Sequence, residues 1–212
     1  MELINPLAEQ FAENASSLPD ALLQELQDFT MASHPESHML SGHLQGKLLS
    51  LISSLLQPAY ILEVGTFTGY SALCLAAGLK KSGELHSIEL RENDAKTAQS
   101  FFDRSPYSDQ IKLHVGDAKM IIPSLEPTWD LVFLDADKTS YVEYFNMIFP
   151  KLRSGGYILA DNIFFHGQVL KENVTGKSAK GIEAFVNYLK ERSDVDKLLL
   201  TIRDGLYIIK KL

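Results

Sequence analysis

From residue 60 onward, short apolar runs alternate with helical segments, and no other feature limits the possible folds of this chain so strongly. Apolar runs of strand length occupy residues 60–64, 84–89, 111–115, 130–134 and 156–160. Helical patterns lie between or after them, at residues 70–79, 91–104, 141–149 and 179–191. Strands that are joined by crossover helices predict a parallel sheet that is covered by helices on both faces.

The end of the chain departs from this alternation. Two further apolar runs, at residues 197–201 and 206–209, have no helix between them, and Asp204-Gly205 is a typical hairpin turn signal. The last strand is therefore expected to run antiparallel to the others. We predict an α/β fold with a doubly wound, mostly parallel seven-stranded sheet whose last strand is antiparallel.

The first part of the chain is expected to be helical. Apolar residues at positions 22, 26 and 29 predict one helix, and leucines at positions 44, 48, 51, 55 and 56 form a helical stripe that ends at Gln57-Pro58. We therefore divide the chain into a helical segment over residues 1–57 and an α/β domain over residues 58–212. The leucine stripes are expected to cover either the sheet domain or a partner subunit.

Composition excludes several classes of protein. A net charge of −7, from 20 basic and 27 acidic side chains, argues against nucleic-acid binding, which requires a basic surface. The single cysteine, Cys74, excludes an internal disulfide and a cysteine-based zinc site. Because no apolar run is long enough to span a membrane and residues 1–6 show no signal-peptide pattern, we expect a cytoplasmic protein without a membrane partner.

Polar residues gather where the predicted strands end. In open α/β sheets, ligands bind beyond the carboxyl ends of the strands, so these residues are the candidates for a binding site. Acidic groups dominate the set, which comprises Glu63, Gly65, Thr66, Glu89, Asp117, Asp135, Asp137, Lys138, Asp161 and Asn162.

The loop from Glu63 to Gly69 is rich in glycine but lacks the three-glycine pattern of dinucleotide-binding sheets. Glu63 stands just before the turn, where it would repel phosphates, and Glu89 is placed to accept both hydroxyls of a ribose. This combination favours S-adenosylmethionine, which has a ribose, an ammonium and a sulfonium but no phosphate. A glycine turn that only tightens the strand–helix connection is the structural alternative.

A second group of residues offers oxygen ligands only. Asp135, Asp161 and Asn162 favour a hard divalent cation such as Mg²⁺, Ca²⁺ or Mn²⁺. Neighbours on a strand point to opposite faces, so Asp161 and Asn162 can face one ion only if the strand ends before them. A cap or turn is the structural alternative for this pair.

Three sequence blocks carry a resemblance to a known family: residues 62–71 (LEVGTFTGYS), 133–138 (FLDADK) and 155–162 (GGYILADN). Together with the closing residues 204–206 (DGL), they occur in the order typical of that family. Residues 39–212 thus resemble the cation-dependent O-methyltransferases of the caffeoyl-CoA and catechol type, including bacterial members. The resemblance implies a Rossmann-like methyltransferase fold, S-adenosylmethionine, a divalent cation, a small phenolic acceptor and a homodimer.

The resemblance also implies roles for individual residues. Asp135, Asp161 and Asn162 match the metal ligands, and Lys138 matches the general base of catechol-type members, with Asp135 beside it at the catalytic centre. His166 falls at a position that faces the acceptor. Cofactor contacts are expected at Met39, Ser41, Glu63, Gly65, Thr66, Ser71, Glu89, Asp117, Ala118, Asp135 and Asp137.

The expected reaction transfers a methyl group to a phenolic oxygen that has a vicinal hydroxyl. A free phenol has a pKa of about 10 and is a poor nucleophile at neutral pH. A cation that chelates both oxygens would lower that pKa, and Lys138 would accept the proton. A dication would lower the pKa of Lys138 as well, whereas neighbouring carboxylates oppose this change.

Two alternatives stay open. Glu89 would hold the ribose of a nicotinamide cofactor equally well, so an NAD(P)-dependent oxidoreductase is one of them. The missing third glycine and Glu63 before the turn argue against it. The other is a methyltransferase-like module that forms a dimer and binds without catalysis. Methylation of RNA or protein is disfavoured by the acidic balance and by the lack of a target-reading segment.

Overall fold

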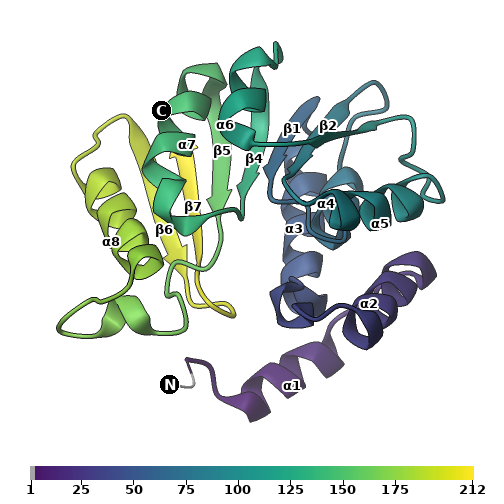
Figure 1. Cartoon of the computed structure of the whole chain (residues 1–212), viewed down its shortest axis with the longest axis horizontal. Coiled ribbons are helices and arrows are strands. Elements are labelled where there is room, and N and C mark those ends of the chain that lie inside the picture. Colours follow the sequence, from purple (N-terminus) through teal and green to yellow (C-terminus); the bar gives the residue numbers. More distant parts are fainter. Residues whose placement is uncertain (1–2) are drawn as a thin grey trace.

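A seven-stranded sheet forms the centre of the computed structural model, which describes residues 3–212 (Figure 1). Residues 1 and 2, with which the predicted helical segment begins, lie outside the described residues. The strand order is β3-β2-β1-β4-β5-β7-β6. The strands are β1 Tyr60–Val64, β2 Glu84–Glu89, β3 Ile111–Val115, β4 Trp129–Leu134, β5 Leu152–Ala160, β6 Val195–Leu200 and β7 Leu206–Lys211.

The pairing of the strands confirms the predicted sheet. β1 pairs in parallel with both β2 and β4, and β4 pairs in parallel with β5. β7 lies between β5 and β6 and runs antiparallel to both. The order along the sheet reverses between β1 and β4, and the carboxyl ends of strands at such a point form a natural ligand-binding edge.

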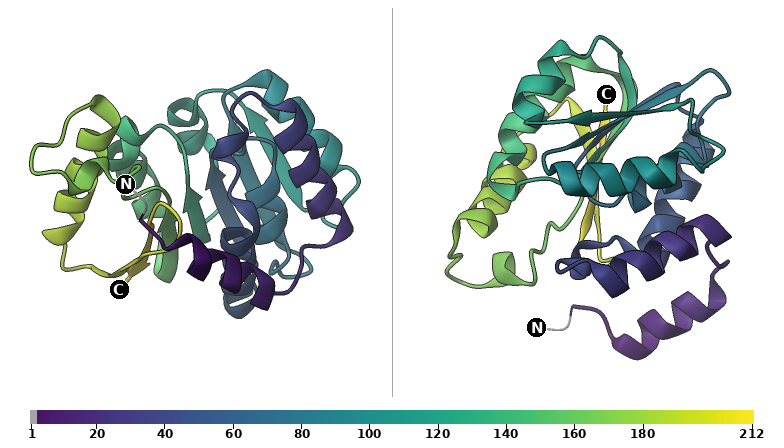
Figure 2. Two further views of the ribbon diagram at one scale, coloured as in Figure 1. Left: turned by 90° about the horizontal axis from the view of Figure 1, so that it is seen from below. Right: turned by 45° about the vertical axis from the view of Figure 1, so that its right-hand side comes forward.

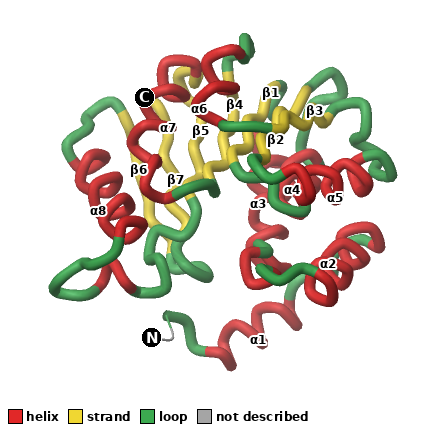
Figure 3. The backbone as a smooth tube through the Cα atoms, in the orientation of Figure 1, coloured by secondary structure: helices red, strands yellow, loops and turns green. Residues whose placement is uncertain are grey.

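Helices cover both faces of the sheet (Figure 3), as the alternation of elements predicts. Several begin or end a few residues away from the expected bounds, and the short helix α6 was not predicted. The helices are α1 Pro6–Ala15, α2 Ala21–Ser33, α3 Gly42–Leu56, α4 Tyr70–Ala76, α5 Glu92–Phe102, α6 Ala118–Ile121, α7 Tyr141–Ile148 and α8 Lys177–Lys190.

Alternate residues of each central strand enter two separate hydrophobic cores. In β4, Leu131 and Phe133 join one core with residues of α2, α3, α4 and α5. Val132 and Leu134 join the other core with residues of α6, α7 and α8. This is why the central strands are continuous apolar runs, since both of their faces are buried.

The buried face of α3 follows the predicted leucine stripe only in part, since Leu48 and Leu56 pack against the core but two other leucines of the stripe do not. Leu49 is fully buried, whereas Leu51 and Leu55 are 52% and 84% exposed. Small residues determine this orientation, because α3 packs closely against the segment after α4. The Ser53 hydroxyl donates to the Leu75 carbonyl at 2.6 Å, and a Cβ on Gly78 would lie 2.1 Å from the Ser53 backbone.

The N-terminal helices differ in how closely they join the sheet. α2 and α3 contribute Leu26 and Leu49 to the same core as β1 and β2. α1, which was not predicted as a separate helix, has no buried residue, and its Leu7 and Phe11 are 75% and 76% exposed. It lies at the outer edge of the molecule, on the side of α2 and α3 (Figure 2). Within residues 3–212, no helix is both long and apolar enough to cross a membrane.

The orientation of α3 leads to a prediction about two leucines of the same helix. Replacing the buried Leu49 with alanine should lower the free energy of unfolding by about 2–5 kcal/mol, because it leaves a cavity in the core. Leu55→Ala should change it by less than about 0.5 kcal/mol, because Leu55 is exposed. Urea denaturation of the two variants measures both values, and equal losses would show that the leucine stripe is the packed face after all.

Candidate active site

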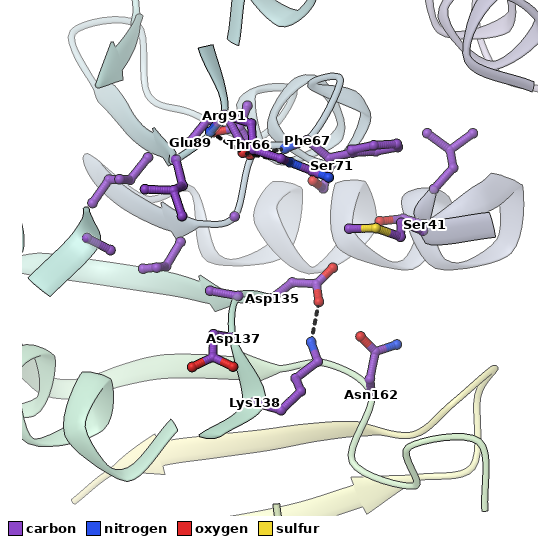
Figure 4. Close-up of a pocket in the computed structure, with 18 of the residues that line it drawn as sticks. Ser41, Thr66, Phe67, Ser71, Glu89, Arg91, Asp135, Asp137, Lys138 and Asn162 are labelled. Carbon is purple, nitrogen blue, oxygen red and sulfur yellow. Dashed lines mark hydrogen bonds and ion pairs between the residues drawn. The ribbon is translucent and has the colours of Figure 1, made fainter. Parts of the chain in front are cut away.

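A cavity of about 420 Å³ opens at the carboxyl edge of the sheet, where the strand order reverses. The segment that precedes α3 closes one side of it, and the loops after β1 to β5 and the turn between β6 and β7 contribute to the rest. Figure 4 shows how the labelled side chains converge on this space. Thirteen of the predicted site residues line it: Met39, Ser41, Gly65, Thr66, Ser71, Glu89, Asp117, Ala118, Asp135, Asp137, Lys138, Asn162 and His166.

Two predicted site residues, Glu63 and Asp161, do not line the cavity. Their exposed fractions are 0% and 2%, and both lie buried behind the lining residues. Glu63 therefore acts on the site through the side chains and charges around it, whereas Asp161 would contact a ligand only if the groups that cover it shift.

Backbone hydrogen bonds explain why the strand ends converge. The parallel ladder continues just past the strands, because Asp135 N donates to Val64 O at 2.9 Å and Asp161 N donates to Leu134 O at 3.0 Å. Gly65 permits a close approach between the loops after β1 and β4. It has a φ of +99°, and a Cβ at this position would lie 2.1 Å from Asp135 O. No other residue type fits both requirements.

The Glu89 carboxylate is held in a fixed orientation at one end of the cavity. Its two oxygens accept hydrogen bonds from the backbone N–H groups of Phe67 at 2.7 Å and Arg91 at 2.9 Å. Arg91 lies between this carboxylate and Asp94, with Nε 3.5 Å from Glu89 Oε1 and 2.6 Å from Asp94 Oδ2. A carboxylate that is fixed in this way is suited to receive the hydroxyls of a ribose.

Burial changes the acid–base properties of Glu63. Desolvation raises its pKa to about 8, although hydrogen bonds from Ser71 and Ser87 oppose the change. The Ser87 hydroxyl donates to Glu63 Oε2, while Oε1 is buried without a partner in the described residues. Glu63 is therefore protonated more readily than an exposed glutamate.

Lys138 and Asp135 form the polar centre at the other end of the cavity. Lys138 Nζ donates to Asp135 Oδ1 at 2.5 Å and to the Tyr141 hydroxyl at 2.8 Å. The Tyr141 hydroxyl in turn lies 3.0 Å from the carbonyl oxygens of both Leu134 and Asp161. Tyr141 thus ties Lys138 to the ends of β4 and β5.

The charge state of Lys138 follows from its surroundings. Burial by itself would lower the pKa of Lys138, but the negative charges of Asp135 and Asp161, with a contribution from Tyr141, outweigh it and raise the pKa above its ordinary value. In the protein alone, the side chain is an ammonium that neutralises the neighbouring carboxylates.

Asp161 and Asn162 lie just beyond the end of β5, which is the condition under which both can face one ion. β5 ends at Ala160, and Asn162 has a φ of +57°, so the chain has left the strand at this pair. Gln45 of α3 donates from Nε2 to Asp161 Oδ2 at 2.6 Å. Burial and the nearby charge of Asp135 raise the pKa of Asp161 to about 6.

The donor set is compatible with a hard cation. Among residues 3–212, no three His, Cys, Asp or Glu side chains group around one metal position, so a cation here depends on two carboxylates and an amide. The negative charge of Asp135 raises the pKa of Asp161. The Lys138 ammonium lies 2.5 Å from Asp135 Oδ1 and supplies positive charge to the pair. Carboxylate and amide oxygens are the donors that Mg²⁺, Ca²⁺ or Mn²⁺ prefer, and such an ion would share Asp135 with Lys138 or displace it.

Several residues of the site had no local signal in the sequence. Gln45 is one polar residue within a leucine-rich helix, Tyr141 was seen only as the start of a helix, and Arg203 precedes the Asp-Gly turn. Their partners lie on other elements, so only the tertiary fold identifies them. Arg91 could have been predicted as a site residue, because it follows Glu89 by only two positions in the sequence.

The fold and the site together define a class of protein: a doubly wound α/β protein with a carboxylate fixed by backbone donors at one end of its cavity and a lysine–carboxylate centre at the other. A family model described as O-methyltransferase matches residues 13–212. The chain therefore belongs to the O-methyltransferase family. This confirms the predicted enzyme class, a methyltransferase dependent on S-adenosylmethionine, and rules against the oxidoreductase alternative.

Individual relatives agree with this assignment. The chain is 36% identical over 185 residues to a catechol O-methyltransferase of Niastella koreensis, with 85% of this chain and 83% of the relative covered. An SAH-bound methyltransferase structure from Podospora anserina matches with a TM-score of 0.91 and 26% identity over 98% of this chain and 94% of that one. The structure of the O-methyltransferase of Streptomyces achromogenes involved in tomaymycin synthesis, in complex with SAM, matches with a TM-score of 0.87 and 29% identity. The match covers 100% of this chain and 99% of that one.

Gln45 offers a test of how the buried carboxylate is stabilised. Gln45→Leu has a similar volume but leaves Asp161 Oδ2 without its donor, so it should lower the free energy of unfolding by about 1–3 kcal/mol. Gln24→Leu is the matched control, because Gln24 also donates to an aspartate, Asp28, but on the exposed face of α2. Thermal or urea denaturation compares them. Equal effects would mean that the Gln45–Asp161 bond contributes nothing specific.

The raised pKa of Glu63 predicts a pH dependence of stability. Glutamate in the unfolded chain ionises near pH 4.5, whereas Glu63 in the folded protein stays protonated up to about pH 8. The wild type therefore loses stability as the pH rises through this interval, at a rate of up to about 1.4 kcal/mol per pH unit.

Glu63→Gln should remove this loss, because glutamine does not ionise. Relative to the wild type, the variant should gain stability steadily between pH 5 and about pH 8, as measured by urea denaturation at several pH values. The exposed Glu126→Gln serves as the control and should show no such trend. A constant difference between Glu63→Gln and wild type across this range would contradict the assignment.

Proposed function

We propose that this enzyme transfers the methyl group of S-adenosylmethionine to a phenolic oxygen of a small acceptor with vicinal hydroxyls, in the presence of a divalent cation. One observation carries the proposal: a fixed ribose-type carboxylate, Glu89, and a lysine–carboxylate centre, Lys138 and Asp135, face the same cavity. Relatives named catechol O-methyltransferase and caffeoyl-CoA O-methyltransferase support the acceptor class.

The chain's own groups account for cofactor binding. Glu89 accepts the ribose hydroxyls, and Ser41 and Ser71 line the part of the cavity that would receive the amino-acid end of the cofactor. Structures of relatives in complex with SAH and SAM support this assignment. Met39, which is 45% exposed, lies on the segment that closes the cavity and would reduce access of water to the cofactor.

Asp135, Asp161 and Asn162 are the residues that would hold the divalent cation. When bound, such an ion supplies positive charge that lowers the pKa of a chelated phenol. Gln45 fixes the orientation of Asp161 through the 2.6 Å bond from α3, so this ligand needs little rearrangement.

Lys138 is an ammonium in the protein alone, and it would receive the phenolic proton at Nζ after losing its own proton, which the positive charge of a cation held beside Asp135 would favour. The bond to the Tyr141 hydroxyl and the contact with Asp135 fix Nζ at the edge of the cavity. Tyr141 also restricts the lysine rotamer, because its ring lies 5.0 Å from Nζ. Positioning both reactants in this way is the main contribution that the protein makes to methyl transfer.

Three further features remain predictions from the sequence: a homodimer, a cytoplasmic location, and the absence of nucleic-acid or membrane partners. The exposed Leu7, Phe11, Leu51 and Leu55 on α1 and α3 are compatible with a dimer contact on that side of the molecule.

Methyl transfer from labelled S-adenosylmethionine to catechol tests the proposal. Turnover should require Mg²⁺ and stop when EDTA is added. Asp161→Ala should reduce it by roughly a hundredfold or more, because a cation ligand is lost. Calorimetric titration with S-adenosylhomocysteine should give nearly the same affinity as in the wild type, because Asp161 does not line the cavity.

Asp196→Ala is the control for this experiment, because Asp196 is exposed on β6. It should retain full turnover. Undiminished methylation of catechol by Asp161→Ala in EDTA would overturn the cation's role, and failure of the wild type to methylate any phenol would overturn the acceptor class.

A further inference from the structure

Arg203, in the turn between β6 and β7, brings a guanidinium to the wall of the cavity that the loop after β5 forms. It lines the cavity together with Asn162, Phe165 and His166. Arg203 Nη1 donates to the Ser41 carbonyl and, at 3.1 Å, to Gln45 Oε1. No sequence block or predicted role includes this residue.

The partners of Arg203 distinguish it from the other strong cations that line the cavity. Lys138 is paired with Asp135, and Arg91 is paired with Asp94 and Glu89. Arg203 donates only to neutral oxygens and makes no ion pair with any residue in the described part of the chain, 3–212. A guanidinium without a carboxylate partner in a cavity is suited to bind an anionic group of the ligand.

The wall that carries Arg203 is rigid. Ile163 N donates to Gly205 O at 3.0 Å and Phe164 N donates to Asp204 O at 2.8 Å, which joins the loop after β5 to the β6–β7 turn. A Cβ on Gly205 would lie 2.7 Å from the Phe164 ring, so the two segments are in close contact.

Backbone strain is concentrated in the same wall. The non-glycine residues Asn162, Phe165, His166 and Arg203 all have φ values between +45° and +57°. Such conformations cost free energy, persist only where surrounding contacts enforce them, and cluster at ligand sites. The position of the guanidinium is therefore determined by the fold and not by a flexible side chain alone.

One side chain, Gln45, links Arg203 to Asp161 beside the lysine–carboxylate centre. The Gln45 carboxamide bridges them, with Nε2 on Asp161 Oδ2 at 2.6 Å and Oε1 on Arg203 Nη1 at 3.1 Å. An acceptor whose hydroxyls lie near Asp135 and Lys138 would direct the opposite part of its ring toward this wall. The cavity is also lined by Glu89, Asp117, Asp135 and Asp137, and its other strong cations, Lys138 and Arg91, are already paired with carboxylates, so Arg203 is the favoured position for a negative substituent.

The geometry points to Arg203 as the residue that selects an acceptor with a carboxylate, a dihydroxylated aromatic acid in preference to a neutral catechol. This inference rests on the proposed function. The carboxylate would bind the donors of the guanidinium that Ser41 and Gln45 leave unused. Because a cofactor carboxylate has the same chemistry, the experiment distinguishes the two sources.

The test compares kcat/KM for protocatechuate, a dihydroxybenzoate, with kcat/KM for catechol. The wild type should prefer protocatechuate, and Arg203→Gln should reduce the ratio of the two values by roughly ten- to a hundredfold, the effect of losing a charge-assisted bond. Taking the ratio removes any general loss of activity that both acceptors share. Arg203→Lys keeps the charge but not the planar guanidinium, so its ratio should fall between those of the wild type and Arg203→Gln.

Arg104→Gln is the matched control, because Arg104 is an exposed arginine that pairs with Glu25 outside this cavity, and its ratio should equal that of the wild type. An unchanged ratio in Arg203→Gln, or a wild-type preference for catechol, overturns the inference while the proposed function stands. The other contrary result is that Arg203→Gln lowers the affinity for S-adenosylhomocysteine and lowers kcat/KM equally for both acceptors. That result assigns Arg203 to the cofactor carboxylate and also overturns the inference.

Binding provides a second readout that does not require turnover. Calorimetric titration of protocatechuate and of catechol into the protein saturated with S-adenosylhomocysteine and Mg²⁺ should show the same preference, and Arg203→Gln should abolish it. If the wild type methylates neither compound, the proposed function fails, and this binding preference still decides the role of Arg203.

Discussion

Buried negative charge at the carboxyl edge of the sheet is the constraint on which the rest of the structure depends. Asp161 is buried and Asp135 is partly buried, both after adjacent strands, and a low-dielectric environment holds such groups only with compensating donors. Lys138 supplies charge from one side, and Gln45 supplies a hydrogen bond from α3 on the other. The position of the N-terminal helices and the order of the catalytic centre therefore depend on the same few contacts.

Much of the fold follows from local patterns in the sequence, because strands that are buried on both faces must be continuous apolar runs. The packed face of α3 followed from the leucine stripe only in part, because Leu48 and Leu56 pack on the core and Leu51 and Leu55 are exposed. α3 lies in close contact with the segment after α4, and only a small residue such as Ser53 fits at that contact. Ser53 therefore faces the core there. Most predicted site residues line one cavity, because residues after parallel strands meet at one edge. Glu63 and Asp161 were harder to place, since sequence position does not distinguish a lining side chain from one buried behind it.

The two ends of the cavity come from different parts of the chain. The loops after β1 and β2 provide the Glu89 end, which the family as a whole needs for one constant cofactor. The loop after β5 and the turn before β7 provide the end with Asn162, His166 and Arg203. Family membership therefore defines the methyl donor more closely than the acceptor, since His166 and Arg203 lie outside the sequence blocks that carry the resemblance.

The antiparallel placement of β7 has a consequence for how such enzymes diversify. Because β7 returns between β5 and β6, the tip of the terminal hairpin reaches the reactive edge while its strands stay locked in the sheet. Hairpin tips tolerate insertions and exchanges of residues far better than paired strands do. A lineage can thus acquire new substrates through changes in a handful of tip residues, and the machinery for the methyl donor is inherited intact.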